Sequence, residues 1–134
     1  MNILIVHNKY RYRGGEESVV ENESRILKEN GNNVFYYYRD SKEIDNMNLF
    51  NKIKSLFSSI YSIKSYKEIS ELIKEHDVDV VHVHNVVPLI SFSAYYAAKN
   101  NGCQLIQTLH NYRLLCPNGL FYRNNNIFGI VRIF

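Results

Sequence analysis

Short apolar segments that alternate with amphipathic segments constrain the fold of this chain more than any other feature. Four segments have the β-branched, aromatic and leucine-rich composition of short buried strands. They are residues 2–7 (NILIVH), 33–38 (NVFYYY), 77–84 (DVDVVHVH) and 104–109 (QLIQTL). Because a continuous apolar run is typical of strands buried on both faces, these segments predict a parallel sheet.

Helical periodicity occupies the intervals between these strands. Apolar side chains recur every three or four residues over 16–30, 49–63, from Tyr66 to near His76, and over 89–101. In the first of these helices the buried face is expected to carry Val19, Val20, Ile26 and Leu27. Gly31 and Gly102 suit positions just past a helix end, and Pro88 suits a first helical turn. The alternation predicts an α/β fold, a Rossmann-like open parallel sheet with helices on both faces. Residues 110–134 have no clean period, and we assign no element to them.

The overall composition indicates a single soluble domain. A chain of 134 residues suits one domain, and its net charge of +3 is too mild to indicate a nucleic-acid partner. Met1 and Asn2 lead directly into an apolar run that is too short for a signal peptide or a membrane span, so we expect a cytoplasmic location. Cys103 and Cys116 are expected as reduced thiols, with Cys116 a buried bystander and not a nucleophile.

A basic loop with two glycines follows the first predicted strand. It reads Arg13-Gly14-Gly15-Glu16-Glu17. Adjacent glycines let the backbone approach a ligand closely, and the start of the following helix favours a phosphate or a sugar hydroxyl. The alternative is a tight turn that needs a positive φ. The two glutamates and the incomplete glycine pattern argue against a standard dinucleotide site.

Histidines gather at the predicted strand ends. His82 and His84 point to the same side of their strand, since strand side chains alternate, and His7 and His110 lie near the same edge. A metal cluster is one alternative, but no Asp, Glu or Cys completes a ligand set at regular spacing, so we predict no metal site. We interpret His82 as a hydrogen-bonded core histidine, and we expect His84 and Asn85 to line a cleft.

Three segments together carry a family resemblance. They are GGEESVVENESRILKENGNNV, DVVHVHN and QTLHNYRLLCPNGLFYR, of which the last is the most specific. The region they span resembles the N-terminal, acceptor-side domain of family 4-like glycosyltransferases. These are retaining, metal-independent enzymes of the GT-B fold, common in bacterial polysaccharide and cell-envelope synthesis. The resemblance implies transfer of a sugar from a nucleotide-sugar donor to a saccharide or lipid-linked acceptor, with no cofactor.

The resemblance also implies roles for particular residues. His110, in a T-x-H-[DN] pattern, would lie close to the transferred sugar and is our predicted catalytic residue. From the residues alone, both a structural and a functional role for this histidine stay open. The predicted substrate-binding residues are those of the glycine loop and of the neighbouring strand ends: Arg13, Gly14, Gly15, Glu16, Asn85 and Asn111.

The expected domain organisation is one domain and a tail. Residues 1–123 form the N-terminal domain, and residues 124–134 (NNNIFGIVRIF) depart from the family pattern, as a truncation or a frameshift would produce. The donor-binding C-terminal domain is absent from this sequence, so we expect the chain to be inactive alone.

Two other functions stay open. One is a non-catalytic binding module that partners a separate donor domain. The other is a nucleotide-dependent enzyme of another class, such as an epimerase. The glutamates after Gly15 weigh against the epimerase, and so does the lack of an acidic residue ending the second strand, which Arg39 and Asp40 follow.

The segment 49–63 raises the question of membrane contact. Its broad apolar face and nearby lysines, including Lys52 and Lys54, suit a helix that lies peripherally on an anionic membrane. Its polar face is mainly Asn and Ser, however, so we favour packing of this helix on the sheet.

Overall fold

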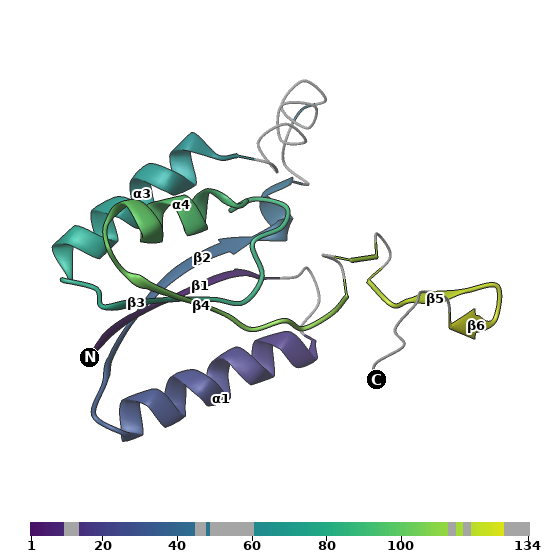
Figure 1. Ribbon diagram of the computed structural model, residues 1–134, viewed down its shortest axis with the longest axis horizontal. Coiled ribbons are helices and arrows are strands. Elements are labelled where there is room, and N and C mark those ends of the chain that lie inside the picture. The colour runs from purple at the N-terminus through teal and green to yellow at the C-terminus, as the bar shows by residue number, and fades with distance from the viewer. Residues whose placement is uncertain (10–13, 45–47, 49–60, 113–114, 117–118, 128–134) are drawn as a thin grey trace.

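A four-stranded parallel sheet forms the centre of the molecule (Figure 1). The computed structural model describes residues 1–9, 14–44, 48, 61–112, 115–116 and 119–127. The strands are β1 (Asn2–Lys9), β2 (Asn33–Asp40), β3 (Val80–Val83) and β4 (Gln104–Gln107). They lie in the order β2-β1-β3-β4, and each neighbouring pair is parallel. The carboxyl ends of all four strands therefore meet at one edge of the sheet.

Helices cover both faces of this sheet. Helix α1 (Gly15–Glu29) lies on one face, and α3 (Ile63–Glu75) and α4 (Ser93–Asn100) lie together on the other (Figure 1). A short 3₁₀ helix, η1 (Ser41–Ile44), follows β2. This arrangement confirms the predicted fold class, a Rossmann-like α/β fold with an open parallel sheet and helices on both of its faces.

The position of β1 inside the sheet explains why the middle of this strand, residues 3–6, is apolar. Leu4 and Val6 pack toward α3 and α4, whereas Ile3 and Ile5 pack toward α1. All four side chains are at most 6% exposed. Because successive side chains of a strand point to opposite faces, a strand covered on both sides has no polar position in its middle.

Helix α1 presents only part of the predicted face to the sheet: Val20 is buried and Leu27 packs against the same cluster, as predicted. Val19 and Ile26 are exposed, and the buried positions are Glu17, Val20 and Ser24. These three recur at the three- and four-residue spacing of a helical stripe, so the stripe itself is regular. The prediction is therefore confirmed for Val20 and Leu27 and wrong for Val19 and Ile26, because it selected only apolar residues whereas the buried stripe of α1 includes polar ones.

Helix α4 begins later than predicted. Pro88 follows a cis peptide bond and lies in a turn, and the helix starts at Ser93. Ser91 has a positive φ of 67°, and its hydroxyl accepts a hydrogen bond from the N–H of Ser93. Local bonds from serine side chains compete with helical bonds, which explains why the apolar pattern of 89–101 overestimates this helix.

Strands β3 and β4 are both shorter than predicted. The predicted segments 77–84 and 104–109 contain strand only over Val80–Val83 and Gln104–Gln107. The residues that follow each strand leave the sheet as loops at its carboxyl edge. Strand β4 forms one border of the sheet, and its Leu105 and Ile106 are 42% and 49% exposed.

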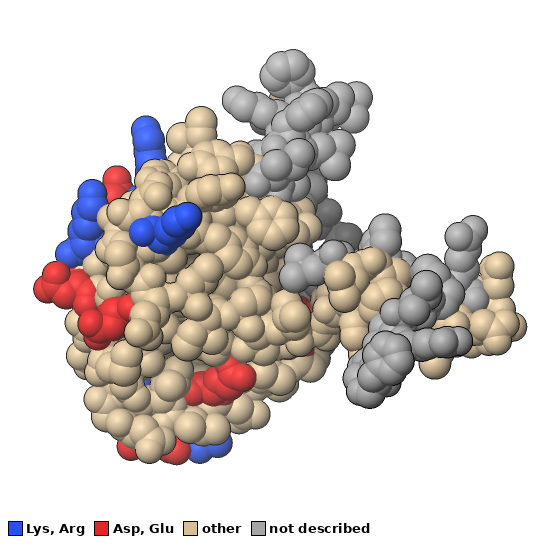
Figure 2. Space-filling model, in the orientation of Figure 1, with Lys and Arg blue, Asp and Glu red and all other residues tan. Residues whose placement is uncertain are grey.

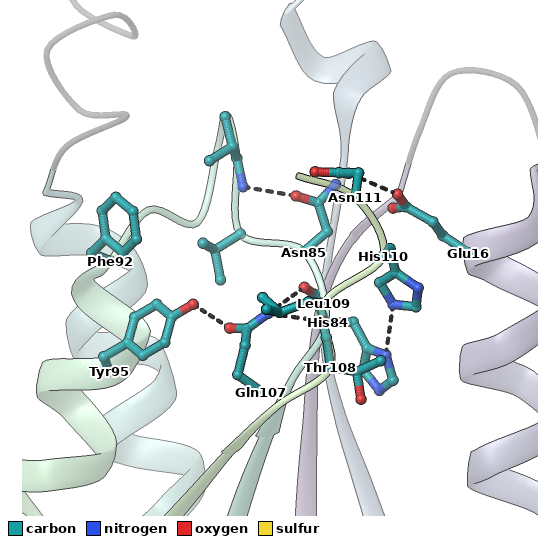
Figure 3. A pocket seen from close by; sticks show the side chains of 12 residues that line it. Glu16, His84, Asn85, Phe92, Tyr95, Gln107, Thr108, Leu109, His110 and Asn111 are labelled. Carbon is teal, nitrogen blue, oxygen red and sulfur yellow. Dashed lines mark hydrogen bonds between the residues drawn. The ribbon is translucent and has the colours of Figure 1, made fainter. Parts of the chain in front are cut away.

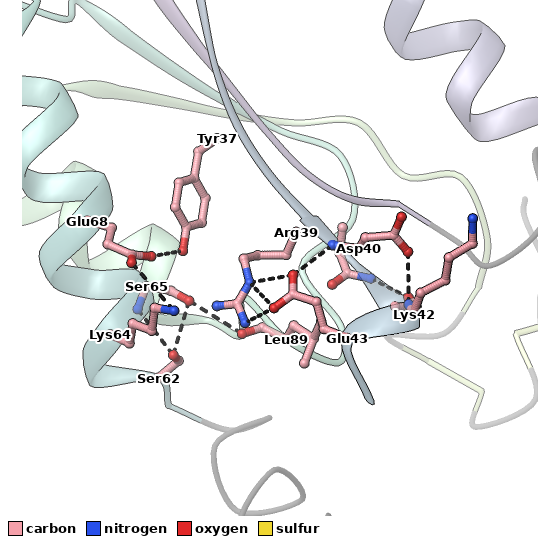
Figure 4. A network of polar contacts seen from close by, with 12 residues as sticks. Tyr37, Arg39, Asp40, Lys42, Glu43, Ser62, Lys64, Ser65, Glu68 and Leu89 are labelled. Carbon is pink, nitrogen blue, oxygen red and sulfur yellow. Dashed lines mark hydrogen bonds and ion pairs between the residues drawn. The ribbon is translucent and has the colours of Figure 1, made fainter. Parts of the chain in front are cut away.

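Polar contacts fix the carboxyl end of β2 against α3 and η1 (Figure 4). The Tyr37 hydroxyl donates to Glu68 at 2.6 Å, and the Arg39 guanidinium donates to Glu43 at 2.9 Å. The strand continues to Asp40, whose carboxylate accepts the N–H of Lys42 at 2.8 Å. An acidic residue therefore does end the second strand, which removes one of the two sequence arguments against an epimerase.

The last described residues form a small hairpin. Strands β5 (Tyr122–Arg123) and β6 (Asn126–Ile127) are antiparallel and lie away from the main sheet (Figure 1). Asn124 and Asn125 connect them with φ values of 51° and 58°. Asparagine tolerates this left-handed conformation, which a two-residue type I′ hairpin turn requires. The hairpin spans the domain boundary that the sequence predicts after residue 123.

The helices of the described residues bear on the question of membrane contact. None of the helices formed by the described residues is both long and apolar enough to span a bilayer. In one view, most of the described surface is neither acidic nor basic, and the acidic and basic side chains lie mainly toward the left side and the lower edge (Figure 2). Lys52, Lys54 and most of the helix predicted over 49–63 lie outside the described residues.

Candidate functional site

A pocket lies at the carboxyl edge of the sheet, between the ends of β3 and β4 and the start of α1 (Figure 3). Its walls come from the loops after the two strands, from α1 and from the start of α4. They include four of the predicted site residues: Glu16, Asn85, His110 and Asn111. The topology produces this arrangement, because parallel strands place their following loops at a common edge, where ligands of open α/β sheets bind.

A histidine cluster lies beside this pocket on the α1 face of the sheet. His82 and His84 are on the same side, as predicted, with ring centroids 4.3 Å apart. The ring of His84 stacks on that of His110, and its Nδ1 lies 3.0 Å from Nε2 of His110. His82 Nε2 forms a hydrogen bond of 2.8 Å with the hydroxyl of Thr108, which agrees with our interpretation of His82 as a hydrogen-bonded core histidine.

Burial keeps two histidines, His7 and His84, neutral. Desolvation lowers the pKa of His7 to about 4. The nearby carboxylate of Glu17, 4.0 Å away, opposes this effect only in part. Desolvation, together with the neighbouring histidines, lowers the pKa of His84 to about 3. Both nitrogens of His7 are buried and have no hydrogen-bond partner among the described residues. His7 and His84 are therefore neutral imidazoles at neutral pH.

Acidification is expected to destabilise the protein through these two histidines. Since their folded-state pKa values lie below the ordinary 6.5, unfolding takes up protons, and stability present above pH 6.5 is lost as the pH falls toward 4. We expect the free energy of unfolding to drop by about 2–4 kcal/mol between about pH 7 and pH 5. Urea denaturation at both values measures this drop. His7→Phe should reduce it by about half, and an unchanged pH dependence in that variant would contradict the assignment.

Neither glycine of the loop has the positive φ that only glycine adopts easily. Gly14 is the N-cap of α1 with a φ of −126°, and its N–H donates to the carboxylate of Glu17 at 2.7 Å. Gly15 does not have a positive φ, and a Cβ added to it would meet nothing within 4 Å. The alternative of a tight turn that requires a positive φ is therefore wrong for both glycines. Their small size leaves open space at the start of α1, which a ligand can approach. Arg13 lies outside the described residues.

The two asparagines predicted to bind substrate are both anchored by the protein. Asn85 accepts the N–H of Val87 at 3.2 Å, and its amide reaches the backbone oxygen of Asn8 at 3.4 Å. The amide of Asn111 donates to Glu16 at 3.2 Å and so joins the β4 loop to α1 (Figure 3). Both residues line the pocket, and their contacts fix the shape of its wall.

An acidic residue accompanies the histidines, contrary to the sequence analysis. Glu23 of α1 places Oε2 3.4 Å from His84 Nε2 and 3.7 Å from His82 Nε2. These three residues form a group that could hold a metal ion. An acid therefore does complete a possible ligand set, and spacing along the chain did not predict it because Glu23 comes from a different element. The available signal was the helical stripe of α1, on which Glu23 lies close to the buried Val20 and Ser24.

Residues of α4 complete the other wall of the pocket. Phe92 and Tyr95 line it, and the Tyr95 hydroxyl donates to the side chain of Gln107. Gln107 in turn donates to the backbone oxygen of His84 at 2.8 Å, which ties β4 to the β3 loop. The sequence analysis missed these residues, since aromatic residues in a helix are usually part of the core.

The fold and the site together define a class of protein. An open parallel α/β sheet with a polar pocket at the carboxyl ends of its strands is a Rossmann-like domain that binds a ligand at that edge. The family model of Glycosyltransferase Family 4 matches residues 13–133, which is most of the sequence. The chain belongs to this glycosyltransferase family.

Two individual proteins are similar to this chain. An uncharacterized 42.6 kDa protein in the cps region of Klebsiella pneumoniae is 26% identical over 160 residues, covering 99% of this chain and 43% of that protein. The chain thus spans less than half the length of this relative. The structure named S. aureus MnaA-UDP co-structure matches with a TM-score of 0.53 and 15% identity, covering 80% of this chain and 28% of the other. At this identity the match supports the fold alone.

Proposed function

We propose that this chain supplies the acceptor-side half of a GT-B glycosyltransferase. The complete enzyme would transfer a sugar from a nucleotide-sugar donor to a saccharide or lipid-linked acceptor, with retention of configuration and without a metal. We place the reaction in the cytoplasm and in the synthesis of a bacterial polysaccharide. The relative in a cps region supports the polysaccharide role, and membership of glycosyltransferase family 4 supports the reaction class.

The observation that carries this proposal is the pocket with His110 in its wall. Its polar groups suit a sugar: imidazole, amide and carboxylate side chains exchange hydrogen bonds with hydroxyl groups. The described part of the pocket offers Glu16, His110 and Asn111 together with the aromatic Phe92. Glu16 at the helix start opposes a phosphate there, so we assign this wall to the acceptor or to the transferred sugar, and not to the diphosphate.

The donor nucleotide is proposed to bind mainly to a second domain. We therefore expect the isolated chain to bind UDP- or GDP-sugars weakly or not at all in calorimetric titration. Joined to a donor-binding domain of a family relative, it should transfer sugar from one member of a panel of nucleotide sugars. Micromolar affinity of the isolated chain would contradict the assignment of the donor site. Failure of the joined, folded protein to transfer any sugar would favour a non-catalytic binding module.

A further inference from the structure

A line of three polar side chains runs from α1 to the pocket. Glu23 Oε2 lies 3.4 Å from Nε2 of His84, and Nδ1 of His84 lies 3.0 Å from Nε2 of His110. The His84 side chain is fully buried, and neither its Nε2 nor Glu23 Oε2 has a hydrogen-bond partner among the described residues, so each has the other as a near polar neighbour. Each ring nitrogen of His84 therefore faces one neighbour, the carboxylate on one side and His110 on the other.

A neutral His84 has one proton to place on two nitrogens. With the proton on Nδ1, the lone pair of Nε2 would face the carboxylate of Glu23, and two acceptors would meet in a buried place. With the proton on Nε2, the N–H faces the carboxylate and Nδ1 accepts a hydrogen bond from Nε2–H of His110. The contact of 3.4 Å is longer than a well-formed hydrogen bond. The negative charge of the carboxylate nevertheless favours an N–H over a lone pair at this distance.

A metal ion is the other occupant to consider between Glu23, His82 and His84. The separations of 3.4 Å and 3.7 Å from Glu23 Oε2 resemble those between ligands of a tetrahedral zinc ion. With zinc bonds of about 2.0–2.1 Å, such ligands lie about 3.4 Å apart. However, His82 Nε2 already forms a hydrogen bond of 2.8 Å with Thr108. With a proton on His84 Nε2, His84 faces the carboxylate of Glu23 and His82 keeps its hydrogen bond to Thr108. The observations therefore favour a proton over a metal ion at this place.

We propose that Glu23 is a positioning residue, which acts through His84 to hold the proton of His110 on Nε2 and to leave its Nδ1 as a hydrogen-bond acceptor. His110 lines the pocket, so this assigns the polarity of the group it meets there. An acceptor nitrogen pairs with a hydroxyl and not with a phosphate oxygen. That this hydroxyl belongs to a sugar rests on the proposed function, whereas the proton arrangement does not.

Nuclear magnetic resonance of the ¹⁵N-labelled chain tests the proposal directly. Correlations between imidazole nitrogens and carbon-bound protons distinguish the two neutral forms of each histidine. Near neutral pH we expect His84 and His110 to be protonated on Nε2, in roughly tenfold or greater excess over the Nδ1–H form. A wild-type His84 or His110 that carries its proton mainly on Nδ1 would overturn the proposal, and this measurement needs no variant.

A variant of Glu23 adds a test of causation. Glu23→Gln removes the negative charge that favours an N–H at His84 Nε2, and the amide can donate a hydrogen bond to this nitrogen as well as accept one. The Nδ1–H forms of His84 and His110 should therefore rise to a measurable share of each population. The matched control is Glu29→Gln, on an exposed glutamate near the end of the same helix, which should leave both histidines unchanged. A folded Glu23→Gln protein with unchanged His110 would contradict the proposal.

Titration of the same sample with zinc distinguishes a proton from a metal ion between Glu23, His82 and His84. Under the proposal, zinc chloride should leave the resonances of His82 and His84 in place at equimolar concentration. Joint shifts of both that disappear in Glu23→Gln would establish a metal site and overturn the proton arrangement. Because these measurements need no sugar, a correct proton arrangement without sugar binding would count against the proposed function alone.

Discussion

Replacing His110 with alanine is expected to lower turnover of the complete transferase by about 100-fold or more, the scale typical of a lost catalytic hydrogen-bonding group. His110 lines the pocket at the end of β4, and its ring is held by His84 through a contact of 3.0 Å. Alanine removes the group that would meet the substrate and leaves the rest of the wall in place. Steady-state kinetics of this chain joined to a donor-binding domain would measure the loss.

A second histidine provides the control for this experiment. His76 caps the end of α3 and stacks on Phe35, at the edge of the sheet where the strands begin. His76→Ala removes an imidazole far from the pocket and should keep near-normal turnover. Circular dichroism and thermal unfolding would establish that both variants fold. Near-normal turnover in folded His110→Ala would make His110 a structural residue.

The order of the elements could be predicted from the sequence because it depends on patterns local to each segment. The apolar run of β1 and the helical period of α3 each report burial directly. Gly31 and Gly102 follow helices with positive φ values of 76°, as their positions indicated. The ends of β3 and the start of α4 could not be predicted, since serine hydroxyls and backbone turns decide them and these leave no apolar pattern.

The candidate site could be predicted only in part. His84, Asn85 and His110 were found because topology alone places strand ends together. Glu23 was missed because only apolar residues were considered for the buried face of α1, although Glu23 lies between Val20 and Leu27 at helical spacing on that face. Polar residues in a buried stripe are rare in ordinary cores, where an unpaired polar group costs stability. Their presence in α1 is itself a sign that this face of the sheet carries a site.

The burial of the central strand β1 can be tested by comparing its effect on protein stability with that of the border strand β4. Leu4→Ala is expected to lower the free energy of unfolding by about 2–5 kcal/mol, because it removes a fully buried side chain and leaves a cavity. That is a large share of the roughly 5–15 kcal/mol that holds a domain of this size together. The matched control is Leu105→Ala on the border strand β4, where the same side chain is 42% exposed. The control should cost less than about 1.5 kcal/mol, because less apolar surface leaves water there on folding and the partly exposed position leaves no closed cavity. Urea denaturation of the three proteins would measure both differences. Equal losses in the two variants would mean that another segment covers β4 in solution as completely as α3 and α4 cover β1.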